Sequence, residues 1–520
     1  MPLNEPNTRQ STSLLPASTR SINSYLRVQA THGKRKSRRY GCTIAIIGGG
    51  FSGTTLAAQL LHGATASLSV VLIERRPYLG RGVAYATRCP AHLLNVPAEK
   101  MSAFGDDPTH FLRWARRRLG PHVDPCDFLP RGLYGEYVES ALCEEVRRHL
   151  GQFEWRHEEA CAITCAGGSL DILLHNGEAV RADRVVLALG NFPPRDPLLP
   201  GRSNLCQHYV PDPWAENALD HLTPADSILL IGSGLTSVDV AVAARTRGFK
   251  GTIHILSRHG LLPKGHRLSA ARASICGLDS FPPTAHGLLR WVRRQTETAE
   301  VRGFDWRLVV DSLRPFTQQI WQSLPYAERQ RFLRHLRPYW EVHRHRLAPE
   351  IDVLVASEIS SGQILIHSGR ITAFHEKSKG VEISYRDRKS GKLESLRVEC
   401  AFNCTGPEVD CRKVRDPLLK DLLSRKLACP SPLFLGLQVS EAGALIDSHG
   451  RASDLIYTIG PARKGALWET TAVPEIRHQI SELANHLFAS CVQNNSPSPG
   501  SAQGAVTTEA GVEVLGHGTA

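Results

Sequence analysis

The feature that most constrains the fold of this 520-residue chain is a glycine-rich turn between a buried strand and an apolar helix, and it occurs twice. In the first copy an apolar strand-like run, 43–47, precedes a G-x-G-x-x-G turn and an apolar helical stretch, 54–61. A further apolar run, 68–73, follows and ends in Glu74. A strand, a glycine-rich turn, a helix and a parallel strand in this order form a βαβ unit that binds a dinucleotide. The chain is therefore predicted to be an α/β protein with parallel sheets.

The residues of the first turn have separate roles in such a unit. Gly48 permits the tight turn, Gly50 lets the backbone approach a pyrophosphate, and Gly53 lets the helix lie close to the strand. Ser52 lies at the start of the helix, where free N–H groups and the helix dipole favour a phosphate. Glu74, at the end of the second strand, can accept hydrogen bonds from ribose hydroxyls. These five residues are the predicted contacts of the first dinucleotide.

The second copy of the turn follows an apolar run at 227–231. It contains Gly232, Gly234 and Thr236, and Ser237 stands where the third glycine is expected. Serine is small enough to let the helix pack beside the strand, so the second copy also predicts a dinucleotide site.

The residue after the second strand of each unit predicts which dinucleotide binds. Glu74 lies 26 residues after Gly48, and Arg258 lies 26 residues after Gly232. A carboxylate repels a 2′-phosphate, whereas Arg258, helped by Ser257, can bind one through charge-assisted hydrogen bonds. The first site is therefore predicted to hold FAD and the second NADPH. The alternative is that Arg258 is a solvated surface charge and the second site takes NADH.

Beyond the two turns, several blocks are similar to those of a known group of proteins. They are 80–85, 92–98, 183–190, 401–406 and 468–475. On these residues the chain, over about 41–490, resembles bacterial FAD/NAD(P)-binding flavoproteins with two dinucleotide-binding domains, which are related to flavin-containing monooxygenases and ornithine N-hydroxylases. The resemblance implies two Rossmann-like domains, with the NADPH domain inserted in the FAD domain, a helical insertion and disordered termini.

The expected domain boundaries follow from that resemblance and from composition. They are a disordered basic tail at 1–40, the first part of the FAD domain at 41–215, the NADPH domain at 216–405 with its helical insertion at 281–349, the second part of the FAD domain at 406–493, and a disordered tail at 494–520.

The resemblance also implies a reaction and further site residues. Asn95 is similar to the asparagine that flavin-containing monooxygenases place beside the isoalloxazine, and it is the catalytic candidate; alternatively, it caps the turn before Pro97. Gly460 and Trp468 are implied as FAD contacts. The implied activity is an NADPH-dependent FAD monooxygenase, an oxidoreductase that oxygenates a small molecule with O2 through a flavin hydroperoxide. The alternative is a reductase or dehydrogenase that passes electrons to another acceptor, and a binding protein without turnover is a third class.

Charge and cysteine content exclude other functions. The formal charge is +12, but residues 1–40 alone supply +7, which leaves too little for a nucleic-acid groove. No apolar run approaches the roughly 18 residues that span a bilayer, so no membrane insertion and a cytoplasmic location are expected. Thirteen cysteines without a C-x-x-C pair indicate free thiols rather than a disulfide framework or a metal site. A homo-oligomer is possible.

The segment 281–349 has the pattern of several helices rich in arginine and aromatic residues. The spacing of Trp291, Trp306, Trp321, Tyr339 and Trp340 predicts that they pack in a core. Residues 281–350 hold twelve arginines and seven acids, an excess that suits an anionic substrate or a basic surface. The basic surface is the favoured interpretation of this excess. The His-Arg-His-Arg run at 343–346 is interpreted as a solvated or substrate-lining basic face rather than a metal site, because alternate residues on a helix point in different directions.

Overall fold

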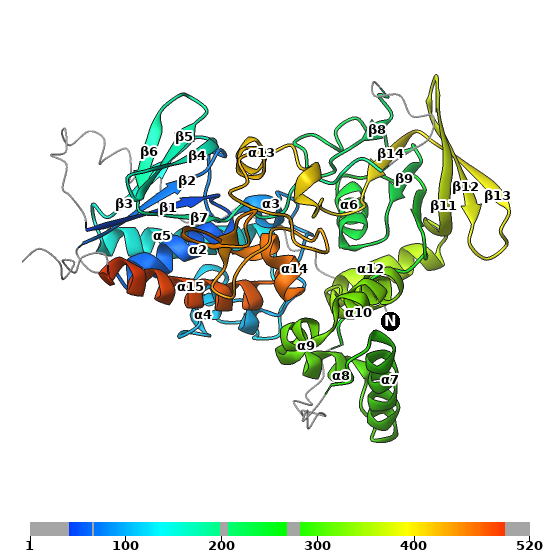
Figure 1. The fold of residues 1–520 in the computed structure, drawn as a ribbon. Coiled ribbons are helices and arrows are strands. Elements are labelled where there is room, and N and C mark those ends of the chain that lie inside the picture. Colours follow the sequence, from blue (N-terminus) through cyan, green and yellow to red (C-terminus); the bar gives the residue numbers. More distant parts are fainter. Residues whose placement is uncertain (1–40, 65–66, 198–205, 268–280, 494–520) are drawn as a thin grey trace, which may run out of the picture.

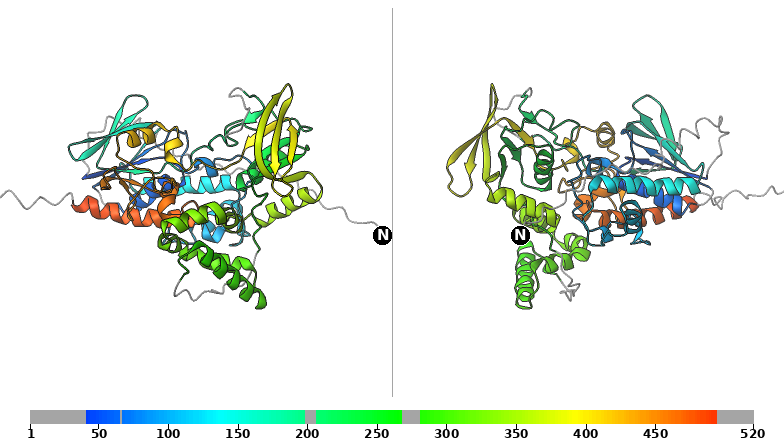
Figure 2. Two further views of the ribbon diagram at one scale, coloured as in Figure 1. Left: turned by 45° about the vertical axis from the view of Figure 1, so that its right-hand side comes forward. Right: turned by 180° about the vertical axis from the view of Figure 1, so that it is seen from behind.

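The computed structural model describes residues 41–64, 67–197, 206–267 and 281–493. The two tails that the sequence predicts to be disordered lie outside these residues. The described chain forms two large sheets side by side, a small antiparallel sheet, and a group of helices apart from both large sheets (Figures 1 and 2). None of the helices in the described ranges combines the length and the hydropathy needed to cross a bilayer.

The first large sheet has the strand order β15-β16-β7-β1-β2-β3, and every pair of neighbours is parallel except β15 and β16. Its strands are β15 (Ala444–Ile446), β16 (Ala452–Thr458), β7 (Arg184–Leu187), β1 (Cys42–Ile47), β2 (Leu68–Ile73) and β3 (Phe153–Arg156). Because β15 and β16 follow the second sheet in the chain, the first sheet is completed only near its C-terminal end.

Both faces of this sheet are covered, which is why its central strands are apolar without alternation. Ile44 and Ile46 of β1 pack on the helical face, and Ala45 and Ile47 pack on the opposite face. The helical face carries α2 (Phe51–His62), α4 (His110–Leu119), α5 (Arg131–Arg148) and α15 (Val473–Gln493). The opposite face carries α13 (Pro417–Ser424) and the three-stranded sheet of β4 (Ala160–Ala166), β5 (Ser169–Leu174) and β6 (Ala179–Ala182).

The second large sheet has the order β13-β12-β11-β10-β9-β14-β8. Its strands are β13 (Leu393–Val398), β12 (Gly380–Asp387), β11 (Ile364–Lys377), β10 (Ile253–Ser257), β9 (Ile228–Ile231), β14 (Cys400–Asn403) and β8 (Tyr209–Val210). Helix α6 (Leu235–Thr246) follows β9 and buries Val240, Ala241 and Ala244 against it. The chain enters this sheet after β7 of the first sheet and returns from β14 to β15. The predicted α/β architecture with two Rossmann-like units is thus confirmed.

The helical segment lies in the lower part of the view in Figure 1, coloured green to yellow-green. Its helices are α7 (Ala285–Val301), α8 (Trp306–Leu313), α9 (Thr317–Ser323), α10 (Tyr326–Arg331) and α11 (Arg337–Arg344). Helix α12 (Pro349–Ser360) follows and packs on α6 of the second sheet. Trp321 is buried as predicted, but Tyr339 is 45% exposed, so the prediction of a core position is wrong for Tyr339. A helical period alone does not show which aromatic side chain has a facing element to pack against.

The interpretation of the 343–346 run as a solvated face is wrong for two of its residues. Arg344 and Arg346 are only 7% and 3% exposed. Arg344 pairs with Glu475 at the start of α15, and Arg346 pairs with Asp311 of α8. Both arginines are therefore buried and paired; the Glu475 partner of Arg344 is also largely buried, whereas the Asp311 side chain is 50% exposed.

One pair of cysteines departs from the predicted free thiols. Cys42, at the start of β1, forms a disulfide with Cys491, near the end of α15, across 449 residues of sequence. Both residues are buried, at 4% and 7% exposure. The bond joins the first strand of the fold to its last helix.

We expect the replacement Cys491→Ser to lower the free energy of unfolding by about 2–4 kcal/mol, because a cross-link restricts the unfolded chain. Thermal unfolding without reductant measures the effect, and Cys165→Ser, at an exposed free thiol, is the control. Thiol titration of the unfolded, unreduced protein should find at least two thiols fewer than the thirteen cysteines. Thirteen titratable thiols would contradict the disulfide.

Candidate functional site

Two positions in the first turn admit only glycine. Gly48 has φ of +108°, and a Cβ placed on it would lie 2.3 Å from the carbonyl oxygen of Ala188, just after β7. A Cβ on Gly53 would lie 1.9 Å from the carbonyl oxygen of Gly48. The positive φ of Gly48 agrees with the tight turn predicted from the sequence, and its missing side chain lets the turn pack against the end of β7. The missing side chain of Gly53 lets α2 lie close to the turn, as predicted.

The N-terminus of α2 is open to an anion. Gly50 caps the helix without a side-chain hydrogen bond, and the first turn carries no acidic residue. Ser52 lies in this turn and is 7% exposed. The free N–H groups and the positive end of the helix dipole fit a pyrophosphate, which is the group that a dinucleotide brings to such a turn.

Glu74 lies directly after β2, the position from which its predicted role is to bind a ribose, and it also forms a hydrogen bond with the first turn. One carboxylate oxygen accepts a hydrogen bond from the Gly49 N–H at 2.6 Å, and the other accepts one from the Arg76 N–H at 2.8 Å. An ionised carboxylate has about four acceptor positions, so capacity remains for ribose hydroxyls. The ribose contact itself stays a prediction.

Sequence reasoning assigned no site role to the loop at 80–82, which the structure places against the first turn. The Gly80 N–H donates to the Gly49 carbonyl at 2.9 Å and to the Thr54 hydroxyl at 3.0 Å. Gly82 faces Gly50, and a Cβ on Gly50 would lie 3.5 Å from the Gly82 Cα. The sequence signal for this second wall of the site is the pair of glycines, Gly80 and Gly82, soon after β2. In the structure both have positive φ, +79° and +54°.

The second turn repeats the first with one change. Gly232 has φ of +114°, and a Cβ on it would lie 2.4 Å from the carbonyl oxygen of Cys404, just after β14. The hydroxyl of Ser237, the residue in place of the third glycine, donates to the Gly232 carbonyl at 2.6 Å. Helix α6 therefore stands far enough from its turn to admit a serine, as predicted. Its N-terminus at Gly234 and Thr236 has no capping side chain and no acidic residue in the first turn.

The two predicted phosphate contacts at the end of β10 differ in whether their side chains are free to bind a phosphate. The Ser257 hydroxyl accepts from the Gly260 N–H at 2.9 Å and lies 2.8 Å from the Ser233 hydroxyl. Arg258 is exposed and forms no ion pair with any described residue. The pKa of the adjacent His259 is lowered by burial and by the positive charges of Arg388 and Arg258. The guanidinium of Arg258 is thus available to a phosphate in a basic neighbourhood.

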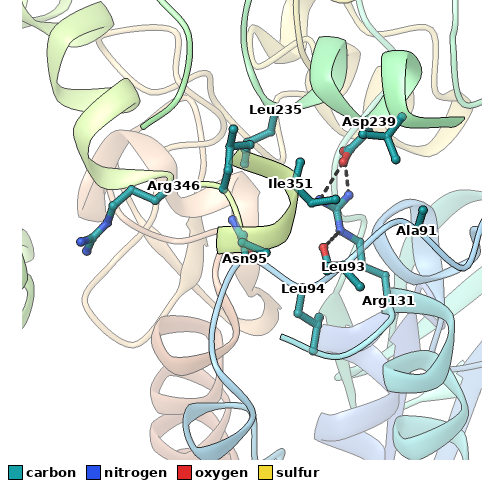
Figure 3. A pocket seen from close by; sticks show the side chains of 12 residues that line it. Ala91, Leu93, Leu94, Asn95, Arg131, Leu235, Asp239, Arg346 and Ile351 are labelled. Carbon is teal, nitrogen blue, oxygen red and sulfur yellow. Dashed lines mark hydrogen bonds and ion pairs between the residues drawn. The ribbon is translucent and has the colours of Figure 1, made fainter. Parts of the chain in front are cut away.

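Asn95 lies at the junction of the two sheets and the helical segment. It lines a cavity of about 10 Å³ together with residues of α6, α12 and the start of α5 (Figure 3). Its backbone carbonyl accepts a hydrogen bond from His266 Nε2 at 3.1 Å. Burial, and then the charge of Arg346, lower the pKa of His266 to about 4, so this imidazole is neutral at neutral pH. The flavin contact and the turn cap remain alternatives for the Asn95 side chain.

The two predicted C-terminal contacts lie in different surroundings. Gly460 has φ of +78°, and its missing Cβ would lie 3.2 Å from the Ser52 hydroxyl, so the structure brings these two predicted residues together. Trp468 is 5% exposed and stacks on Trp321 of α9, with ring centroids 5.0 Å apart. Trp468 thus packs against the helical segment, and its contact with FAD remains a prediction.

Comparison with known proteins agrees with this geometry. Residues 45–192 match the family model described as FAD-NAD(P)-binding, and this range contains the whole first turn, the 80–82 loop and β7. This part of the chain is similar to FAD-NAD(P)-binding domains. The prediction of FAD and a nicotinamide dinucleotide as cofactors agrees with that description. A search of curated proteins finds no match.

Solved structures with the same fold cover both sheets. L-lysine 6-monooxygenase from Pseudomonas syringae has 15% sequence identity and a TM-score of 0.60, with 86% of this chain and 99% of that chain aligned. The ornithine N-hydroxylase of Kutzneria sp. 744, solved with reduced FAD, NADP+ and L-ornithine, has 14% identity and a TM-score of 0.59, over 88% and 100%. A cadaverine monooxygenase from Erwinia amylovora, bound to FAD, has 13% identity and a TM-score of 0.58, over 91% and 99%. The resemblance predicted from the sequence is confirmed at the level of the fold.

Proposed function

We propose that the protein is an NADPH-dependent FAD monooxygenase that oxygenates a small molecule through a flavin hydroperoxide. The observation that carries the proposal is the pair of opposite charges at matched positions, Glu74 after β2 and Arg258 after β10. Support comes from the similarity of residues 45–192 to FAD-NAD(P)-binding domains and from the fold shared with N-hydroxylating monooxygenases. NADPH, a proton, O2 and the substrate would give NADP+, water and the oxygenated substrate. When bound, the flavin would supply the chemistry that takes hydride from NADPH and activates O2.

The chain's own residues would bind and orient the cofactors. The N-terminus of α2, with Gly50 and Ser52, would hold the FAD pyrophosphate, and Glu74 would hold the adenosine ribose. Gly234 and Thr236 at the start of α6 would hold the NADPH pyrophosphate. Asn95 would donate its amide N–H on the flavin side of the junction, and it needs no titration to do so.

The replacement Arg258→Gln tests the choice of coenzyme. Loss of a charge-assisted phosphate contact of about 1.5–3 kcal/mol should raise the KM for NADPH roughly 10- to 150-fold and leave the KM for NADH unchanged. Steady-state oxidation of both coenzymes by the flavin-loaded protein measures this. The control is Arg247→Gln. Arg247 lies just after α6, is exposed and pairs with Asp220, so its replacement should change neither KM. If the Arg258→Gln protein keeps the original preference for NADPH over NADH, the assignment of NADPH to the second turn is wrong.

A reductase or dehydrogenase is the second candidate, because the same two dinucleotide-binding turns would let the protein pass electrons from NADPH through FAD to another acceptor. Reduced protein should be mixed with O2 in the presence of NADP+, and its absorbance followed in a stopped-flow instrument. A transient oxygenated flavin species, with an oxygenated product from an amine, thioether or acid, supports the monooxygenase. Its absence, together with rapid electron transfer to a quinone, supports the reductase.

A further inference from the structure

An ion pair joins the two sheets at the junction that contains Asn95. Arg131, the first residue of α5, extends to Asp239 of α6 and binds its carboxylate in a bidentate manner, at 2.7 and 3.0 Å (Figure 3). The two side chains are only 14% and 11% exposed. A bidentate arginine–carboxylate pair fixes the orientation as well as the distance of its partners. The pair therefore sets how α6 sits against the first sheet.

The same arginine also holds the loop that carries Asn95. Its Nε donates to the carbonyl oxygen of Leu93 at 2.8 Å, and its backbone N–H donates to the carbonyl oxygen of His92 at 2.8 Å. Leu93 lies two residues before Asn95. One guanidinium thus binds both α6 and the Asn95 loop.

A second contact fixes the same turn of α6. Nε2 of His92 lies 2.8 Å from the backbone carbonyl of Asp239, and Nδ1 lies 2.8 Å from the Thr87 hydroxyl. Because a carbonyl only accepts, Nε2 carries the proton and the ring bridges Thr87 to α6. Burial lowers the pKa of His92, and it outweighs the opposing effect of the Asp239 carboxylate. The neutral form that makes these two contacts is therefore the stable one.

The geometry matters because of where Asp239 lies. It comes five residues after Gly234, so the pair fixes the second turn of the helix whose first turn would hold the NADPH pyrophosphate. The cavity between this helix and Asn95 has room for about one water molecule, which leaves little space for the helix to shift. We propose that Arg131 is a positioning residue for hydride transfer, which acts through Asp239 and Leu93 to hold the nicotinamide dinucleotide in register with the flavin. This inference rests on the proposed function.

The chain offers a matched control for a test of this inference. Arg245, on the same helix, pairs with Glu358 of α12 at 2.7 Å, with side chains 14% and 20% exposed. That pair is about as buried as the Arg131–Asp239 pair, but it lies wholly within the second sheet and its helices. Asp239→Asn and Glu358→Gln each remove one carboxylate charge from an ion pair of α6. Only Asp239→Asn weakens the link between α6 and Arg131, the residue that also holds the Asn95 loop.

The experiment measures flavin reduction by NADPH in a stopped-flow instrument, without O2. In Asp239→Asn we expect unchanged FAD content, a dissociation constant for NADPH within about threefold of the original protein, and a limiting reduction rate lowered roughly 10- to 100-fold, since small misplacements of reacting groups have effects of this size. Glu358→Gln should reduce within about twofold of the original rate. Arg131→Lys, which keeps the charge without the bidentate geometry, should lie between the two.

Three results would overturn the inference. One is an unchanged reduction rate in Asp239→Asn, and another is an equal loss of rate in Glu358→Gln, which would indicate general loosening of α6. The third is a loss of NADPH affinity without a loss of limiting rate, which would make Asp239 a binding residue. If the unmodified protein is not reduced by NADPH at all, the proposed function fails first and the inference fails with it.

Discussion

Replacing Gly53 by alanine should give a protein that does not retain FAD and is colourless after purification. The added Cβ would lie 1.9 Å from the carbonyl oxygen of Gly48, so α2 must move away from its turn. Overpacking of this kind costs about 1–3 kcal/mol and sometimes more. An equal loss in binding free energy weakens FAD binding roughly 5- to 150-fold. The flavin absorbance of the purified protein, and titration with added FAD, measure the effect.

The second turn supplies controls for this replacement. A Cβ on Gly234 meets no atom within 4 Å, and Ser237 already carries a side chain at the position that corresponds to Gly53. Gly234→Ala and Ser237→Ala should therefore keep the bound FAD, and Ser237→Ala should lose only about 1 kcal/mol of stability with its hydrogen bond. A yellow Gly53→Ala protein with unchanged FAD affinity would show that the turn is not where FAD binds.

The parts of the fold that could be predicted from the sequence are those that local rules determine. A buried strand, a turn that needs positive φ and a helix that must approach it leave a strong pattern within about 30 residues, and both copies of the turn were found in this way. The serine in place of the third glycine was also interpreted correctly. The Ser237 hydroxyl donates to the Gly232 carbonyl, whereas the equivalent residue of the first turn, Gly53, packs directly against the Gly48 carbonyl.

The parts that could not be predicted depend on contacts between distant segments. Nothing near Arg344 in the sequence indicates that it pairs with Glu475 on α15, so local sequence alone predicts a solvated face there. The disulfide between Cys42 and Cys491 likewise needs both ends of the fold to be in place. The role of Gly80 depends on the position of the first turn, which its own neighbours in sequence do not reveal.

Glu475 is one of two largely buried carboxylates that bind the helical segment; the other is Glu469, which accepts a hydrogen bond from Trp340. Glu475, in the first turn of α15, accepts hydrogen bonds from Arg314 at 2.7 and 3.0 Å and from Arg344 at 3.0 Å. The side chains of Glu475 and Arg344 are 11% and 7% exposed. The carboxylate also lies in the first turn of α15, at the positive end of the helix dipole, where a negative charge is stabilising. Removal of its charge would leave Arg314 without its direct partner, and Arg344 with only Glu469, at 3.9 Å, as an acidic partner among the described residues.

We therefore expect Glu475→Gln to lower the free energy of unfolding by about 3–5 kcal/mol, the usual effect of breaking one side of a buried ion pair. Glu341→Gln is the matched control, because Glu341 pairs with Arg337 with side chains 35% and 36% exposed. It should cost about 0.5 kcal/mol or less, since solvent screens an exposed pair within one helix. Chemical denaturation followed by tryptophan fluorescence measures both, because Trp321 and Trp468 lie in the same contact between the helical segment and the first sheet. Equal losses in the two variants would mean that Glu475 does not hold the helical segment.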